Sequence, residues 1–107
     1  MKEYMINDFE FLVGNNQQEN QKLLDESSQT DIWFHLDKLA SPHGILKCEL
    51  VDLTKTMATQ CSLLIKENSK YKNIKSVSVI YCPMKGVRKT EVPGKVILKG
   101  KTKKITI

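Results

Sequence analysis

Residues 31–36 read Asp-Ile-Trp-Phe-His-Leu, and this stretch decides the fold class that the sequence predicts. It is a short run of large apolar side chains between polar segments, which is typical of a β-strand. Because the apolar residues do not alternate with polar ones, we expect a strand that is covered on both faces of its sheet. Side chains two positions apart project from the same face of a strand, so Asp31, Trp33 and His35 are expected to lie side by side.

The segments around this strand predict further strands and a short helix. Residues 4–6 and 9–13 are rich in aromatic and aliphatic side chains with an Asn-Asp turn between them, so they predict an opening hairpin. Cap-type asparagines precede residues 17–24, which predict a short helix. After a break at a Ser-Pro pair, residues 44–50 predict another strand.

Residues 54–68 are the clearest predicted helix. Thr54 is suited to cap its first turn. The apolar positions recur at helical spacing and make one stripe, formed by Met57, Ala58, Cys61, Leu64 and Ile65. The opposite side is expected to be an exposed polar face with Lys55, Thr59, Ser62 and Lys66.

The rest of the chain predicts strands. Residues 75–82, 87–90, 95–99 and 102–107 carry strand patterns, and the last two are expected to form a final hairpin. Runs of strands with two interspersed helices, and no regular βαβ alternation, predict an α+β fold with a mostly antiparallel sheet and two helices packed on it. The length of 107 residues suits one compact domain spanning residues 1–107.

Charge is distributed unevenly along the chain. The formal net charge is +5, but residues 1–53 carry four lysines and ten acidic residues, a net charge of −6. Residues 54–107 carry thirteen basic and two acidic residues, a net charge of +11. We therefore expect the second half to present a positive surface to a polyanion, although lysines on solvated strands also serve solubility.

Several classes of protein are excluded by what the sequence lacks. No apolar run approaches the ~18 residues of a membrane span, and the first residues are too polar for a secretory signal, so no membrane partner is expected. The three cysteines lie in or beside apolar stretches without metal-ligand spacing, which predicts reduced, buried thiols and a cytoplasmic location. Nucleotide-binding loops and a nucleophile elbow are missing, and we expect no cofactor and no metal.

The residues around strand 31–36 allow three chemical interpretations. An exposed Trp33 could stack on an unpaired base while His35 bonds the edge of that base. The second interpretation is a metal site, because His35, His43 and a nearby aspartate are ligating residue types. The third is acid–base catalysis, for which Asp31, His35 and His43 are weak candidates. The structural alternative is a core tryptophan with two histidines that are hydrogen-bonded locally.

Basic residues complete a predicted nucleic-acid-binding set. It joins Trp33, His35 and His43 to seven cations from a turn, a helix face and the final hairpin: Lys55, Lys66, Lys85, Arg88, Lys89, Lys99 and Lys101. Lysines contact phosphates as point charges and carry little sequence information. The predicted binding is therefore salt-sensitive, and DNA is a permitted partner beside RNA.

The Asp-Ile-Trp-Phe-His stretch, followed by a loop and a second histidine at position 43, resembles the core motif of the NFACT-R RNA-binding domain family. A strand ending in glycine at 9–14, a helix at 61–69 and a Pro-Gly turn at 93–96 resemble further parts of the family in order. The form that it resembles is the N-terminal domain of small eukaryotic coiled-coil proteins. The resemblance implies RNA binding, with tRNA or ribosomal RNA as the substrate class and a role in translation or ribosome quality control.

Three hypotheses follow from the motif and the charge. The first is a non-catalytic RNA-binding domain that holds phosphates through its basic C-terminal half. The second is an RNA-processing or RNA-modifying enzyme that uses Asp31, His35 and His43. The third is a DNA-binding or protein-interaction module.

Overall fold

Strand β3 (Ile32–Leu36) lies inside a six-stranded sheet in the computed structural model, which describes all residues 1–107. The strand order is β1-β2-β4-β3-β5-β8, and every neighbouring pair is antiparallel. The other strands of this sheet are β1 (Lys2–Ile6), β2 (Phe9–Val13), β4 (Gly44–Leu46), β5 (Ser78–Pro83) and β8 (Lys103–Thr106). Because β3 has a partner on both edges, its backbone is satisfied by the sheet and the strand can be buried.

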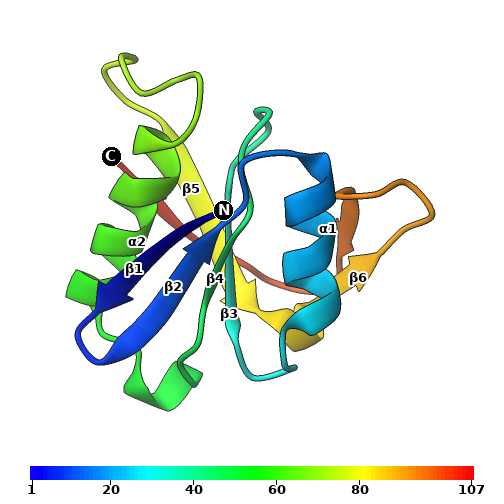
Figure 1. Cartoon of the computed structure of the whole chain (residues 1–107). Helices are drawn as coiled ribbons and strands as arrows, with labels where there is room; N and C mark the ends of the chain where they lie inside the picture. Colours follow the sequence, from blue (N-terminus) through cyan, green and yellow to red (C-terminus); the bar gives the residue numbers. More distant parts are fainter.

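Two helices, α1 (Gln17–Glu26) and α2 (Lys55–Glu67), cover opposite faces of this sheet (Figure 1). Each begins at the residue that the sequence predicts: the side chain of Asn16 accepts a hydrogen bond from the Glu19 N–H, and the side chain of Thr54 accepts one from the Met57 N–H. Two short 3-10 turns, η1 (Leu50–Asp52) and η2 (Met84–Gly86), precede α2 and follow β5. The predicted α+β class, with two helices on a mostly antiparallel sheet, is confirmed.

Neither helix has the length and apolar character that crossing a membrane requires.

Alternate residues of β3 enter two separate hydrophobic cores. Its even-numbered residues join Phe11 and Tyr81 in the core beneath α2, where Phe34 meets the Phe11 ring edge-on at 5.6 Å and stacks on the Tyr81 ring at 5.1 Å. Trp33 instead enters the second core, with Leu23 and Leu24 of α1. The prediction of a strand that is covered on both faces is confirmed.

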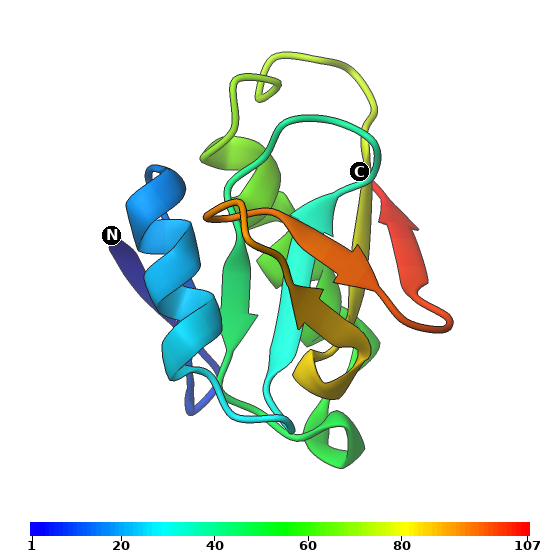
Figure 2. The ribbon, with the colours of Figure 1, turned by 90° about the vertical axis from the view of Figure 1, so that its right-hand side faces the viewer.

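The final hairpin expected from residues 95–107 is wrong. Strand β7 (Val96–Leu98) pairs with β6 (Val87–Lys89) in a separate two-stranded sheet, and β8 pairs with β5 at the edge of the main sheet. The β6–β7 hairpin lies over the same face as α1 (Figure 2). Its turn is fastened to α1, because the Gln17 Nε2 donates to the Pro93 carbonyl at 2.7 Å and the Gly94 N–H donates to the Gln21 Oε1 at 2.8 Å.

Two local expectations also change. The strand expected over residues 44–50 ends at Leu46, because the chain turns there and the Cys48 N–H bonds the Leu46 carbonyl at 2.9 Å. Ser62 was expected on the polar face of α2 but is fully buried, and its hydroxyl donates to the Ala58 carbonyl at 2.8 Å. A hydroxyl that is satisfied within its own helix can lie against the core, which periodicity alone does not reveal.

Candidate nucleic-acid interface

Three rings form a cluster on the α1 face of the sheet. The indole Nε1–H of Trp33 donates to Nδ1 of His43 at 2.9 Å. The imidazole of His35 stacks on Trp33, with centroids 5.4 Å apart and an interplanar angle of 14°, and meets the His43 ring edge-on at 4.9 Å. The topology explains the contact. Strand β3 carries Trp33 and His35, and the loop before β4 places His43 next to them and beside α1.

The hydrogen bonds set the protonation of both histidines. An indole N–H can only donate, so Nδ1 of His43 is the acceptor and its neutral ring carries the proton on Nε2. Burial, and after it the neighbouring His35, lowers the pKa of His43 to about 4. Nδ1 of His35 lies 2.6 Å from the Leu36 carbonyl and must donate to it, while burial lowers the pKa of His35. His35 therefore keeps its Nε2 lone pair as an acceptor near neutral pH.

The backbone of His43 is held by α1 and by the end of β2. The His43 N–H donates to Oδ1 of Asn20 at 3.1 Å, and the His43 carbonyl accepts from the Gly14 N–H at 3.0 Å. Gly14 is needed at this approach, because a Cβ there would lie 2.1 Å from Oδ1 of Asn20. Only glycine lets the strand end pass so close to the helix that supports the histidine loop.

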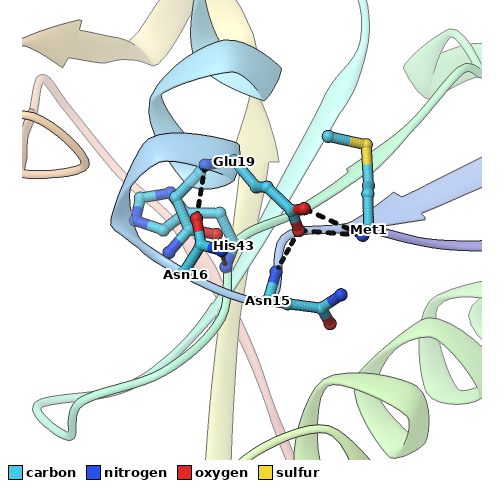
Figure 3. Close-up of polar contacts among 6 residues, drawn as sticks. Met1, Asn15, Asn16, Glu19 and His43 are labelled. Atoms are coloured by element: carbon cyan, nitrogen blue, oxygen red, sulfur yellow. Dashed lines mark hydrogen bonds and ion pairs between the residues drawn. The ribbon is translucent and has the colours of Figure 1, made fainter.

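The N-terminus of α1 beside this cluster already holds an anionic group of the protein itself. Figure 3 shows the Glu19 carboxylate accepting from the Asn15 N–H at 2.8 Å and from the N-terminal amine of Met1 at 3.0 Å. The Asn16 side chain caps the Glu19 N–H in the same view. The first turn of α1 is thus satisfied internally by a carboxylate, the group that a helix N-terminus favours.

A hollow of about 790 Å³ opens beside His35 and His43. It is bounded by the start of α1, the loop after β3, the end of α2 and the turn of the β6–β7 hairpin. Its polar lining includes Asn16, Asn20, Asn68, Lys38, Lys70 and Lys95. Asp37 is the one carboxylate in the lining, and it is paired with Lys104 at 2.9 Å. The hollow therefore offers amides, a neutral imidazole and a surplus of positive charge.

The stacking role predicted for Trp33 is wrong. Its side chain is only 1% exposed, because α1 covers the face of β3 from which it projects. An indole that is sealed in a core cannot receive a base on its ring. The structural alternative is the correct one for Trp33, and His35 is the ring of the cluster that stays partly exposed.

The acid–base grouping of Asp31, His35 and His43 does not form either. The Asp31 carboxylate accepts from the Ser28 N–H at 2.9 Å and from Nζ of Lys47 at 3.0 Å, so it stabilises the loop before β3 and makes no hydrogen bond to either histidine. His35 is oriented by the Leu36 carbonyl instead. The two histidines do meet, but no group of three His, Cys, Asp or Glu side chains has an arrangement that could hold a metal ion.

The predicted basic residues divide between the two faces of the molecule. The larger group belongs to β6, its flanking turns and the chain after β7: Lys85, Arg88, Lys89, Lys99 and Lys101. Lys55 and Lys66 lie near opposite ends of α2, on the other face. Lys89 forms an exposed ion pair with Asp25 at 2.9 Å, and Nζ of Lys66 reaches the Ile107 carbonyl at 3.5 Å.

None of the three cations of the hollow, Lys38, Lys70 and Lys95, was in the predicted set. Lys38 follows β3 with a positive φ of 62°, and Lys70 follows the end of α2. They converge with Lys95 from loops that are far apart in the chain, so no spacing in the sequence signals the grouping. The left-handed backbone of Lys38 is uncommon for a residue other than glycine, but it is visible only in the structure and not in the sequence.

Comparison with known proteins defines the class to which this fold and site belong. The family model for the NFACT protein RNA binding domain matches residues 3–103. The chain belongs to this family, as the motif at residues 31–35 predicts. Membership supports a general role in RNA binding.

Curated relatives match over a shared segment. The chain is 34% identical over 83 residues to coiled-coil domain-containing protein 25 of Mus musculus, and 30% identical over 84 residues to the homolog of that protein in Dictyostelium discoideum. Each match covers 73% of this chain and 40% of the relative, so the chain spans less than half of the length of these proteins.

A solved structure shares the fold. The C-terminal part of the fibronectin/fibrinogen-binding protein from Streptococcus suis aligns with a TM-score of 0.88 and 24% identity, covering 99% of this chain and 44% of the other. At this identity the likeness shows the fold alone.

Proposed function

We propose that this domain is a non-catalytic binder of structured RNA, with tRNA or ribosomal RNA as the substrate class and translation or ribosome quality control as the setting. The observation that carries the proposal is a set of exposed cations without acidic partners on the hairpin side: Lys85, Arg88, Lys95, Lys99 and Lys101. The four ion pairs of the protein neutralise only Lys89 and Lys104 of the basic half. Phosphates are the groups that such a surface attracts.

The hollow beside His35 supports a second kind of contact. It lies next to the hairpin cations, since one of them, Lys95, also lines the hollow. A neutral His35 offers an acceptor, and the amides of its lining offer donors and acceptors to a base edge or a ribose hydroxyl. The ribose 2′-hydroxyl is the group by which such a site distinguishes RNA from DNA.

The salt dependence of binding tests the phosphate contacts. Affinity for tRNA, single-stranded RNA and duplex DNA is measured over a series of salt concentrations with the double variant Lys85→Ala/Arg88→Ala. We expect the slope of log K against log salt to fall by roughly 0.7 to 0.9 for each contact removed. The matched control is Lys2→Ala/Lys72→Ala, which removes two exposed lysines outside the hairpin side.

The outcomes separate the rival functions. An unchanged slope in the hairpin variant contradicts the phosphate assignment. Equal affinity for RNA and DNA contradicts a role for the 2′-hydroxyl. Binding to an acidic protein partner that RNA does not compete away favours the interaction module instead.

We also propose a reducing location such as the cytoplasm. Cys48, Cys61 and Cys82 are all free and buried, and burial raises the pKa of each thiol. Such thiols are inert packing groups that need no oxidising compartment.

A further inference from the structure

The N-terminus of α2 opens into a second hollow on the other face of the sheet. The hollow has a volume of about 560 Å³ and lies between η1, the start of α2 and the neighbouring strands β5 and β8. Its polar lining consists of Thr54, Lys55, Tyr81, Lys103 and Lys104. It holds no carboxylate, and the carboxylate partner of Lys104 is Asp37, outside the hollow.

The first turn of α2 offers backbone donors. Its first intrahelical bond runs from the Ala58 N–H to the Thr54 carbonyl, and the Met57 N–H is taken by the Thr54 side chain. The N–H groups of Lys55 and Thr56 precede these bonds and have no partner within the helix. The first turn of α2 contains no acidic residue, whereas Glu19 fills that role in α1. No acidic side chain of the first turn therefore compensates the positive end of the helix dipole, which favours an anion in the hollow.

Tyr81 supplies an independent hydrogen-bond donor to the hollow. It is only 9% exposed, and its ring is held in place by stacking on Phe34 with an interplanar angle of 17°. Its hydroxyl makes no hydrogen bond within the protein but is accessible from the hollow that the side chain lines, since no buried side-chain nitrogen or oxygen of the protein lacks a partner. Burial raises its pKa, so the hydroxyl stays protonated and can donate near neutral pH. The hydroxyl is therefore a donor in a fixed position that water meets in the hollow and that a ligand can use instead.

Lys103 completes the arrangement from β8. It stands directly opposite Tyr81 in the antiparallel register, so both side chains project from the same face of the sheet. Lys55 approaches from the first turn of α2. Both lysines are exposed and neither is in an ion pair. Two cations, free helix N–H groups and one hydroxyl donor thus surround a single small space.

We propose that this second hollow is a phosphate-binding site, in which Lys55, Lys103, the Tyr81 hydroxyl and the first N–H groups of α2 hold one phosphate group. Only acceptor-rich anions satisfy such an arrangement of donors. The phosphate is either a diester within an RNA chain or a monoester, and the first source rests on the proposed function. The site itself does not, because it lies on the α2 face of the sheet, opposite the face over which the β6–β7 hairpin lies (Figure 1).

Titration of the ¹⁵N-labelled protein with inorganic phosphate tests the site without RNA. Saturable amide shifts are expected at Lys55 and Thr56. Tyr81→Phe removes only the hydroxyl and keeps the ring, so the fold is expected to persist, while the affinity for phosphate falls about fivefold for the loss of one hydrogen bond. Lys103→Gln is expected to weaken binding similarly, and Lys72→Gln is the matched lysine control.

Shifts confined to the hairpin lysines, or equal affinity in the wild type, Tyr81→Phe and Lys103→Gln, would overturn the proposal. Saturable shifts at Lys55 and Thr56 that the two variants weaken support it, even in a protein whose RNA binding fails the salt test. An RNA oligonucleotide with a 5′-phosphate is then compared with the same oligonucleotide ending in a 5′-hydroxyl. Equal shifts identify the diester as the source, and a dependence on the 5′-phosphate identifies the monoester.

Discussion

Mild acid is expected to destabilise this domain through His43. The side chain is 3% exposed and its Nδ1 accepts from Trp33, so the folded protein holds the neutral ring with a pKa of about 4. An unfolded histidine has a pKa of about 6.5. Since the folded pKa is the lower one, the unfolded state binds the proton first as the pH falls. The stabilisation is complete above about pH 6.5 and is lost progressively toward pH 4.

The size of the effect follows from the two pKa values. Between pH 7 and pH 5 the free energy of unfolding should fall by about 2 kcal/mol from His43 alone. His35 adds a loss of the same sign, because burial lowers its pKa as well. The carboxylates with lowered pKa values, Asp25 and Glu19, titrate below this window and do not obscure it.

Chemical denaturation at pH 7, 6 and 5 measures this loss, and the single tryptophan, buried in the folded state, reports unfolding by fluorescence. The variant His43→Asn removes the titration but keeps a side-chain oxygen near the position of Nδ1, so its stability should depend less on pH in this range. Parallel pH profiles for the wild type and His43→Asn would refute the reasoning. So would an NMR titration that places the pKa of His43 at or above 6.5.

Three substitutions test the packing and the surface by the same denaturation assay. Gly44→Ala should cost about 1 to 3 kcal/mol, because its Cβ would lie 2.6 Å from Cδ1 of Ile65 in the core, and an unchanged midpoint would contradict this crowding. Thr54→Ala should cost about 1 kcal/mol through the lost helix cap, whereas Thr54→Ser should restore most of it. Lys89→Ala should leave the denaturation midpoint unchanged within error, because its ion pair with Asp25 is exposed on both sides, and a clear loss would show that the pair is better ordered than its exposure indicates.

Elements whose signals are local were predictable from the sequence. The stripe of α2, the caps at Asn16 and Thr54 and the opening hairpin depend on residues within a few positions of one another. The motif at residues 31–35 also identified the family. Helix periodicity and capping are properties of one or two turns of chain, so a sequence pattern is sufficient to reveal them.

Pairings between distant segments were not predictable in this way. Strands β7 and β8 are neighbours in the chain and carry similar patterns, yet β7 pairs with β6. The turn between β6 and β7 is held on α1 by the bond from Gln17 to Pro93, and these two residues are 76 positions apart in the chain. Strand patterning specifies which residues share a face, and not which other strand or helix meets that face.

The sequence by itself determined the α+β class, the positions at which both helices begin, the family and the contrast between an acidic first half and a basic second half. Only the tertiary structure decided that Trp33 is sealed beneath α1 and donates to His43, whose ring burial keeps neutral. It also decided that the cations divide between two faces, with one hollow beside His35 and another at the start of α2. The reason is physical: burial, pKa and a shared hollow arise from contacts between segments far apart in the chain, and spacing along the chain does not encode them.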